Sequence, residues 1–202
     1  MKIMVSTDVK GAITTWTEWA SKPDVQRYDI ALFKIWIQFE KFLSNLFLSY
    51  ATGNPSETGY VPPLNLQFKS EEQFNAFMVD GNKKYIEYFD KIEKLSKHIF
   101  VVNPFDILLS DAKYKPVVQE VRALRNYIAH ESGEAKRKVI NACFSGNERR
   151  FVDPNEYLKS RERETRNTYY TYYTTCIAEM VDILIEAPAD TEGVTNDTSA
   201  GE

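Results

Sequence analysis

The sequence predicts an all-α fold, a bundle of four to five helices with short accessory helices. Apolar residues recur three and four positions apart over several long segments, which is the spacing of one helical face. Residues typical of helix ends, such as proline, asparagine and glycine, bound these segments. No two segments show the pattern of a strand pair. With 202 residues, 43% of them hydrophobic, the chain can bury a full core, and we expect a single domain over residues 1–187.

The first long helix is expected over residues 24–51, directly after Pro23. The segment 53–55, Gly-Asn-Pro, ends it. The apolar positions that form its buried face are Tyr28, Leu32, Ile35, Trp36, Phe39, Leu43, Leu46, Phe47 and Tyr50.

A second helical region is expected over residues 71–99. Ser70 and Gln73 have the spacing of a capping box at its start. The Gly-Asn pair at 81–82 breaks or bends this region into two parts. A short helix should follow, from Asn103-Pro104 through Leu109.

The third long helix is expected over residues 116–131, with Pro116 in its first turn and Gly133 near its end. A short helix fits residues 134–145.

Asp153-Pro154 begins the last long helix, which we expect to continue without a break to residue 186. Residues 188–202 show no apolar periodicity and form the expected disordered acidic tail.

The charges divide the chain into unequal blocks although the net charge is only −4. Residues 113–166 hold 13 Lys/Arg against 8 Asp/Glu, a net of +5, whereas residues 167–202 hold no Lys/Arg and 7 Asp/Glu, a net of −7. Such separation can create a positive surface on an acidic protein. The alternative is that these charges only solvate helix faces.

The chain carries no apolar run long enough to span a bilayer, and its first residues lack the apolar core of a signal peptide. We therefore expect a cytoplasmic protein without a membrane partner. Cys143 and Cys176 lie far apart and belong to no Cys/His cluster, so we interpret them as two buried, reduced thiols and expect no metal and no cofactor.

The segment that offers acid–base chemistry ends at His130, one of two histidines in the chain. On a helix, Val117, Val121, Leu124 and Ile128 share the core-facing side. Arg122, Asn126 and His130 follow one another at i, i+4 on the opposite side. Arg125 lies about 140° around the helix from His130 and about 7.5 Å along its axis. A joint site of Arg125 and His130 therefore needs a frayed helix end or a second subunit.

The string Arg125-Asn126-Tyr127-Ile128-Ala129-His130 resembles the R-x4-H motif of the HEPN superfamily in its R-N-x-x-A-H form, as in RiboL-PSP-HEPN-like ribonuclease domains. The resemblance covers about twenty residues in sequence; beyond them only the predicted helical architecture agrees. It implies a HEPN-like bundle that is usually dimeric, with the motif at the interface. Many members are RNases of toxin–antitoxin, abortive-infection or RNA-processing systems.

The resemblance also implies a metal-independent endoribonuclease whose catalytic residues are Arg125, Asn126 and His130. The RNA 2′-hydroxyl would attack the adjacent phosphorus and leave a 2′,3′-cyclic phosphate. His130 would remove the proton of the 2′-hydroxyl or protonate the 5′-oxygen that leaves. Arg125 would hold the phosphate and stabilise the charge that builds up on it. Asn126 would position His130 or the scissile phosphate. The implied partners are RNA, such as tRNA or mRNA, a second copy of the chain, and an antitoxin or regulatory protein.

Other residues are candidates for contacts to RNA or to the motif. Arg122, Lys136, Arg137 and Lys138 would add contacts to the RNA backbone, although the three on 136–138 equally fit an exposed helix face. Glu120 is a candidate partner for Arg125. Tyrosines 169–173 would either stack on RNA bases or, as we favour, pack in the bundle or a dimer interface.

Three functions stay open on the sequence alone. The first is a toxin-like or phage-defence ribonuclease. The second is a HEPN domain that binds RNA, a nucleotide or a protein without cutting. The third is an unrelated helical scaffold in which Arg125 and His130 are ordinary surface residues.

Overall fold

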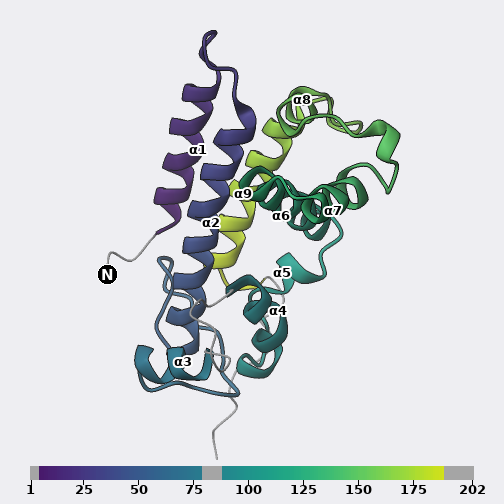
Figure 1. Ribbon diagram of the computed structural model, residues 1–202. Coiled ribbons are helices and arrows are strands. Elements are labelled where there is room, and N and C mark those ends of the chain that lie inside the picture. Colours follow the sequence, from purple (N-terminus) through teal and green to yellow (C-terminus); the bar gives the residue numbers. More distant parts are fainter. Residues whose placement is uncertain (1–4, 79–87, 189–202) are drawn as a thin grey trace, which may run out of the picture.

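A computed structural model describes residues 5–78 and 88–188 of the chain. The predicted all-α fold is confirmed, because the described residues form helices joined by loops and contain no sheet, only two isolated β-bridges (Figure 1). Expectations for residues 79–87 and for the tail at 189–202 lie outside the described part.

The centre of the fold is the long helix α2 (Tyr28–Ala51), which was predicted as residues 24–51. It contacts α1, α3, α4, α6, α8 and α9. Its buried face carries the predicted positions Leu32, Ile35, Trp36, Phe39 and Leu43, among others. The first turn of α2 is capped from outside, because the Asn155 side chain accepts a hydrogen bond from the Tyr28 backbone N–H at 2.8 Å.

Helix α1 (Ser6–Ala20) was not predicted; it packs as a hairpin beside α2 and also contacts α9 (Figure 1). Its sequence includes Gly11 and several threonines, which are poor helix formers. Only Val9 and Ala20 among its apolar residues are fully buried. Tertiary packing against α2 and α9 therefore stabilises a helix that the local sequence favours weakly.

The region 71–99 forms two helices where it is described, α3 (Glu71–Met78) and α4 (Tyr88–Ile99). At the start of α3, Ser70 Oγ accepts the Gln73 backbone N–H at 3.2 Å as predicted. The Gln73 side chain accepts the N–H of Lys69 rather than that of Ser70. The short helix α5 (Asp106–Leu109) follows Asn103-Pro104 as expected.

Helix α6 (Tyr114–His130) carries the motif, and α7 (Gly133–Cys143) follows almost at once. The end of α6 was predicted within one residue, but the role given to Gly133 is wrong. Glu131 takes the left-handed conformation after α6, with φ of 45°. Ser132 then accepts the Ala135 backbone N–H as the N-cap of α7, so Gly133 begins a helix instead of ending one.

The predicted helix at 154–186 is interrupted. It consists of α8 (Pro154–Lys159), a loop, and α9 (Tyr169–Ile185), and a short 3-10 turn η1 (Glu148–Arg150) precedes α8. The loop sequence 160–168, SRERETRNT, contains no apolar residue with which a helix could face the core. Thr168 starts a new helix by accepting the Thr171 backbone N–H at 3.1 Å.

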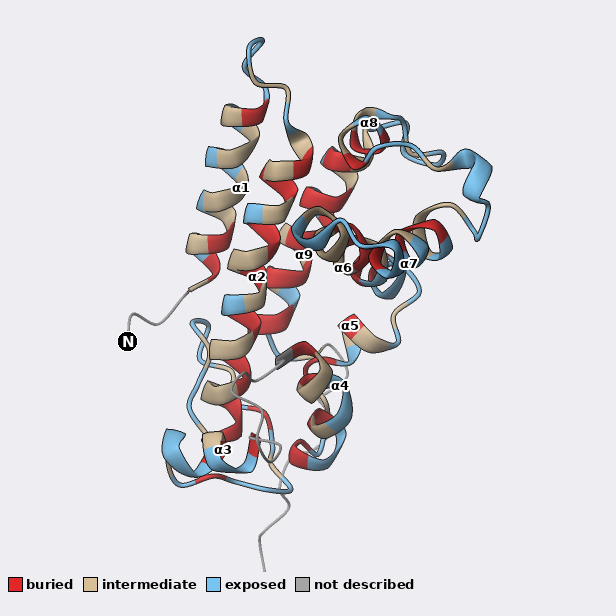
Figure 2. Ribbon diagram, viewed as in Figure 1, coloured by how far each residue is buried: buried red, intermediate tan, exposed pale blue. Residues whose placement is uncertain are grey.

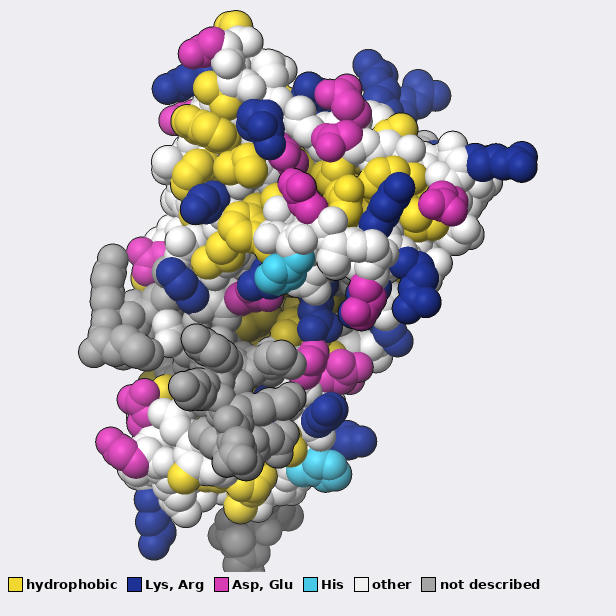
Figure 3. Space-filling view, in the orientation of Figure 1, with side chains coloured by type: hydrophobic (Ala, Val, Ile, Leu, Met, Phe, Trp, Pro, Cys, Tyr) yellow, Lys and Arg dark blue, Asp and Glu magenta, His cyan; other side chains and the backbone are white. Residues whose placement is uncertain are grey.

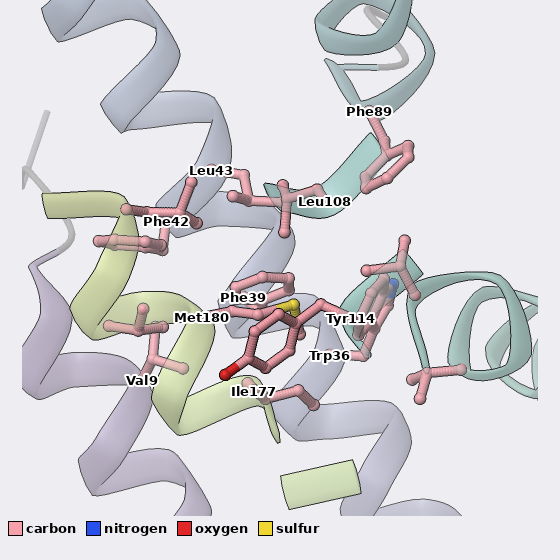
Figure 4. Packing of buried hydrophobic residues seen from close by; sticks show 14 of the residues in the cluster. Val9, Trp36, Phe39, Phe42, Leu43, Phe89, Leu108, Tyr114, Ile177 and Met180 are labelled. Carbon is pink, nitrogen blue, oxygen red and sulfur yellow. The ribbon is translucent and has the colours of Figure 1, made fainter. Parts of the chain in front are cut away.

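The hydrophobic core lies between α2, α6 and α9, and α1, α4 and α5 close its sides (Figures 2 and 4). Figure 4 shows Trp36 and Phe39 of α2 gathered with Ile177 and Met180 of α9, and Leu43 of α2 beside Leu108 of α5. The four long helices α1, α2, α6 and α9 form the bundle, and α6 lies against α2 with Tyr127 and Ile128 of the motif packed against the core and His130 exposed.

Candidate functional site

The motif lies on α6 with the predicted distribution of faces. Val117, Val121 and Leu124 are buried, and Ile128 is half-buried. On the other side, burial decreases toward the end of the helix, because Asn126 is half-buried and His130 is exposed. The amphipathic pattern of α6 therefore fixes which motif residues face solvent.

A polar hollow of about 640 Å³ lies beside the motif, between α2, α4, α6 and α7. Figure 3 shows this face of the molecule as recessed between charged side chains. The charged and amide residues of its lining are Glu40, Lys41, Asp90, Arg122, Arg125, Asn126 and Lys138. Four cations against two carboxylates give the hollow a positive balance, which suits a phosphate.

Arg125 is held at the hollow by two neighbours. Its Nη2 donates to Glu40 Oε2 at 3.3 Å and its Nη1 donates to Asn126 Oδ1 at 2.9 Å. Its Nε is buried without a hydrogen-bond partner among the described residues. The Glu40 contact is single and long, and both side chains are about one-third exposed, at 30% and 32%. The guanidinium is thus oriented but keeps donors free for an incoming anion.

Arg122 takes part in a second ion pair at the same hollow. Its Nη2 donates to Asp90 Oδ1 at 2.6 Å, and its guanidinium carbon lies 4.2 Å from the centroid of the Phe89 ring. This arrangement combines a charge pair with a cation–π contact. Arg122 is therefore anchored by α4, more firmly than Arg125 is by α2.

His130 lies apart from Arg125. It is exposed, it does not line the hollow, and its ring has no hydrogen-bond partner within the described part of the chain. Asn126 does not orient it, because the Asn126 side-chain oxygen accepts from Arg125 instead. Helix α6 stays regular up to His130, so no frayed end brings the two groups together.

The three basic residues of α7 do not act as one patch. Lys138 lines the hollow and pairs with Glu134 at 2.9 Å. The Nζ of Lys136 lies 4.7 Å from the centroid of the Phe151 ring, away from the hollow lining. Arg137 is exposed and does not line the hollow. Of this cluster, only Lys138 joins the candidate site.

The carboxylate beside Arg125 comes from a different helix than expected. Glu120 was the candidate, but its Oε2 accepts the hydroxyl of the buried Tyr173 on α9 at 2.7 Å. Glu40 takes that place from α2, 85 positions away in sequence. Nothing in the sequence around Glu40 distinguishes it, because only the packing of α2 against α6 brings it to Arg125.

The tyrosines of α9 pack in the bundle, the interpretation that we favour, although Tyr169 and Tyr172 are only half-buried. Tyr170 and Tyr173 are buried. The rings of Tyr157 and Tyr169 stack with centroids 4.4 Å apart, and the hydroxyls of Tyr157 and Tyr173 share a hydrogen bond of 3.0 Å. Buried tyrosines of this kind satisfy their hydroxyls within the core, and they cannot stack on an RNA base.

The half-buried carboxyl group of Glu120 makes stability depend on pH. Burial raises the pKa of Glu120 above its ordinary value, against the opposing effect of the hydrogen bond from Tyr173. A raised pKa in the folded state favours the protonated form, so the contribution of Glu120 is greatest at low pH and is lost as pH rises through the raised pKa. We expect Glu120→Gln to raise the urea midpoint at pH 8 and to reduce the decline in stability between pH 5 and pH 8. Glu93→Gln, at an exposed position of α4, should change neither; equal effects of both variants would contradict this prediction.

Both cysteines are free, and Cys176 is buried as expected, whereas Cys143 is only half-buried. No group of three or more His, Cys, Asp or Glu side chains within residues 5–78 and 88–188 is arranged to hold a metal ion. Among the described helices, none combines the length and apolar character needed to cross a membrane. Comparisons with protein-family models, curated proteins and solved structures found no match to this chain.

Proposed function

We propose that this protein is a metal-independent endoribonuclease that acts as a homodimer, with Arg125, Asn126 and His130 as its catalytic residues. One observation carries the proposal: Arg125 and Asn126 are held together at a positively lined hollow, while His130 on the same helix is exposed and unpartnered outside it. The phosphate-binding groups and the acid–base group are thus both present but are separated within one chain.

A second copy of the chain would bring a histidine close to Arg125 and Asn126. When two α6 helices meet about a twofold axis, His130 of one subunit can approach the hollow of the other. Each dimer then contains two equivalent sites, each with an arginine and an asparagine from one chain and a histidine from the other. The resemblance of the motif to HEPN ribonucleases supports the same arrangement.

The chemistry follows from the side chains. Arg125 binds the scissile phosphate and stabilises the charge that develops on its oxygens. His130 accepts the proton of the 2′-hydroxyl as that oxygen attacks phosphorus, or protonates the 5′-oxygen as it leaves. Asn126 keeps the guanidinium in place through its 2.9 Å hydrogen bond. The products are a 2′,3′-cyclic phosphate and a 5′-hydroxyl, and DNA is not a substrate because it lacks the attacking group. A toxin-like or phage-defence effector is the biological role that fits such an activity.

A non-catalytic RNA- or nucleotide-binding module is the second candidate. It is favoured by the absence of His130 from the lining of the hollow in the described part of one chain, since Arg125, Arg122 and Lys138 alone would bind a phosphate without cleaving it.

The test is incubation of the purified protein with total RNA, tRNA and DNA in EDTA, followed by analysis of the product ends. We expect RNA fragments that end in 2′,3′-cyclic phosphate, and intact DNA. RNA that is bound but not cut by a folded dimer would overturn the ribonuclease in favour of the binding module.

A further inference from the structure

A narrow open strip runs along the central helix α2. Of the 24 residues of α2, only Lys34 and Lys41 are exposed. They are seven positions apart, so they point in nearly the same direction, about 20° apart around the helix and about 10.5 Å apart along its axis. The half-buried Ile37 lies about 40° around the helix from Lys41, and the half-buried Phe33 lies about 80° from it, at the edge of the strip.

Aromatic rings flank the first lysine. The Nζ of Lys34 lies 6.0 Å from the centroid of the Phe33 ring and 6.0 Å from that of Trp16 on α1. Trp16 is half-buried and meets the ring of Trp19, also half-buried and on the same helix, edge-on at 5.4 Å. We define the α1–α2 strip as Trp16, Phe33, Lys34, Ile37 and Lys41. Figure 3 shows hydrophobic and basic side chains interspersed over α1 and α2 on this face.

The strip leads into the candidate site. Ile37 and Lys41, its last two members, also line the hollow that holds Arg125 and Asn126. Neither Lys34 nor Lys41 forms a salt bridge within residues 5–78 and 88–188, in contrast to Lys10, Lys113, Lys138 and Lys159, which all pair with carboxylates. Two unpaired lysines and two accessible rings are thus aligned with the phosphate-binding residues.

This combination matches single-stranded nucleic acid. Proteins bind single strands by placing cations along the backbone and stacking bases on aromatic side chains. A duplex would offer its phosphates but not the faces of its bases, so the rings favour a single strand. A second copy of this chain is the other occupant to consider, but it would leave two unpaired lysines at an interface without a complementary charge on the strip.

We propose that the α1–α2 strip binds single-stranded RNA, with Lys34 and Lys41 on its phosphates and a base stacked against Trp16 and Phe33, and that it guides the strand to Arg125. The inference rests on the proposed ribonuclease for the identity of its substrate. It adds a preference for unpaired RNA and a binding surface outside the motif.

The test is the affinity of fluorescein-labelled oligouridylate and oligoadenylate, measured by fluorescence anisotropy at several salt concentrations. All proteins carry His130→Ala, so that the RNA stays intact. We expect the double change Lys34→Glu/Lys41→Glu to weaken binding by about tenfold or more and to reduce the slope of log K against log salt by about 1.4, since each phosphate contact contributes about 0.7 on a single strand. Trp16→Leu, which keeps an apolar side chain but removes the ring, should weaken binding by about five- to hundredfold. A self-complementary duplex should bind less tightly than either single strand.

The matched control is Lys115→Glu, an exposed lysine at the other end of α6, which should bind RNA as the parent does. Equal affinity of the double variant and this control would overturn the proposal, as would tighter binding of the duplex. Loss of the dimer in the strip variants with unchanged RNA affinity would identify the strip as an interface between copies and would equally overturn it. The two proposals fail separately. If RNA binding depends on the strip but the wild type does not cleave RNA, only the proposed ribonuclease activity is contradicted. If the wild type cleaves RNA and the double variant has the same KM, only the proposed role of the strip is contradicted.

Discussion

His130→Ala is expected to lower RNA cleavage by about 100- to 10,000-fold, the range typical of a lost general acid–base group. The fold should not change, because His130 is exposed and its ring has no hydrogen-bond partner in the described part of the chain. Arg125→Ala should lower cleavage by about 100- to 1,000-fold through lost stabilisation of the transition state. Arg125→Lys should restore little of this, since an ammonium group does not reproduce the planar donors that contact Glu40 and Asn126.

The control is built into the chain, which has only one other histidine. His98 lies exposed in the last turn of α4, and His98→Ala should cleave RNA as the wild type does. Initial rates on tRNA in EDTA, with urea denaturation of each variant, measure both effects. Full activity in His130→Ala would remove the basis of the proposed mechanism.

Phe39→Ala is expected to produce a large loss of stability. Phe39 is completely buried on α2, and its ring lies 5.2 Å from that of Trp36 and 6.5 Å from that of Phe42, between centroids (Figure 4). Removing a buried phenyl ring leaves a cavity and costs about 3–5 kcal/mol. Domains are commonly stable by only about 5–15 kcal/mol, so this variant should lose a large share of its free energy of unfolding.

Urea denaturation measures that loss, with Val101→Ala as the comparison. Val101 is 59% exposed in the loop after α4, and its truncation should change the free energy of unfolding by less than about 0.5 kcal/mol. A Phe39→Ala midpoint close to that of Val101→Ala would mean that the core is not centred on α2.

The helical fold class and the side of α6 on which the motif residues lie could both be predicted from the sequence, because both depend on local periodicity. The buried positions of α2 and α6 follow the apolar spacing that predicted them. The failures occur where local signals are weak or misleading. Helix α1 has threonines and a glycine, and its packing against α2 and α9 explains why it is helical. The break at 160–168 was visible as a run without apolar residues, but Asp153-Pro154 and the tyrosine-rich face beyond suggested one continuous helix.

The candidate site shows the same division. The placement of Arg122, Asn126 and His130 on the open side of α6 needed only helical geometry. The ion pairs could not be predicted from helical geometry, because Glu40 and Asp90 belong to other helices, 85 and 32 positions away in sequence from their arginine partners. Pairing over such distances depends on how the helices pack, and this packing cannot be predicted from the residue pattern of a single sequence. The hollow itself arises in the same way, from four helices that meet beside the motif.

The central claim is that Arg125 of one subunit and His130 of another act on the same phosphate. Its most direct test is a heterodimer of Arg125→Ala and His130→Ala, coexpressed with two different tags and isolated by tandem purification. One of its two sites then has both groups intact, so we predict cleavage at about half the wild-type rate from two chains that are each inactive as homodimers. If Arg125 and His130 act within one chain, neither site of the heterodimer is complete. Activity no higher than that of the parent variants would therefore contradict the account.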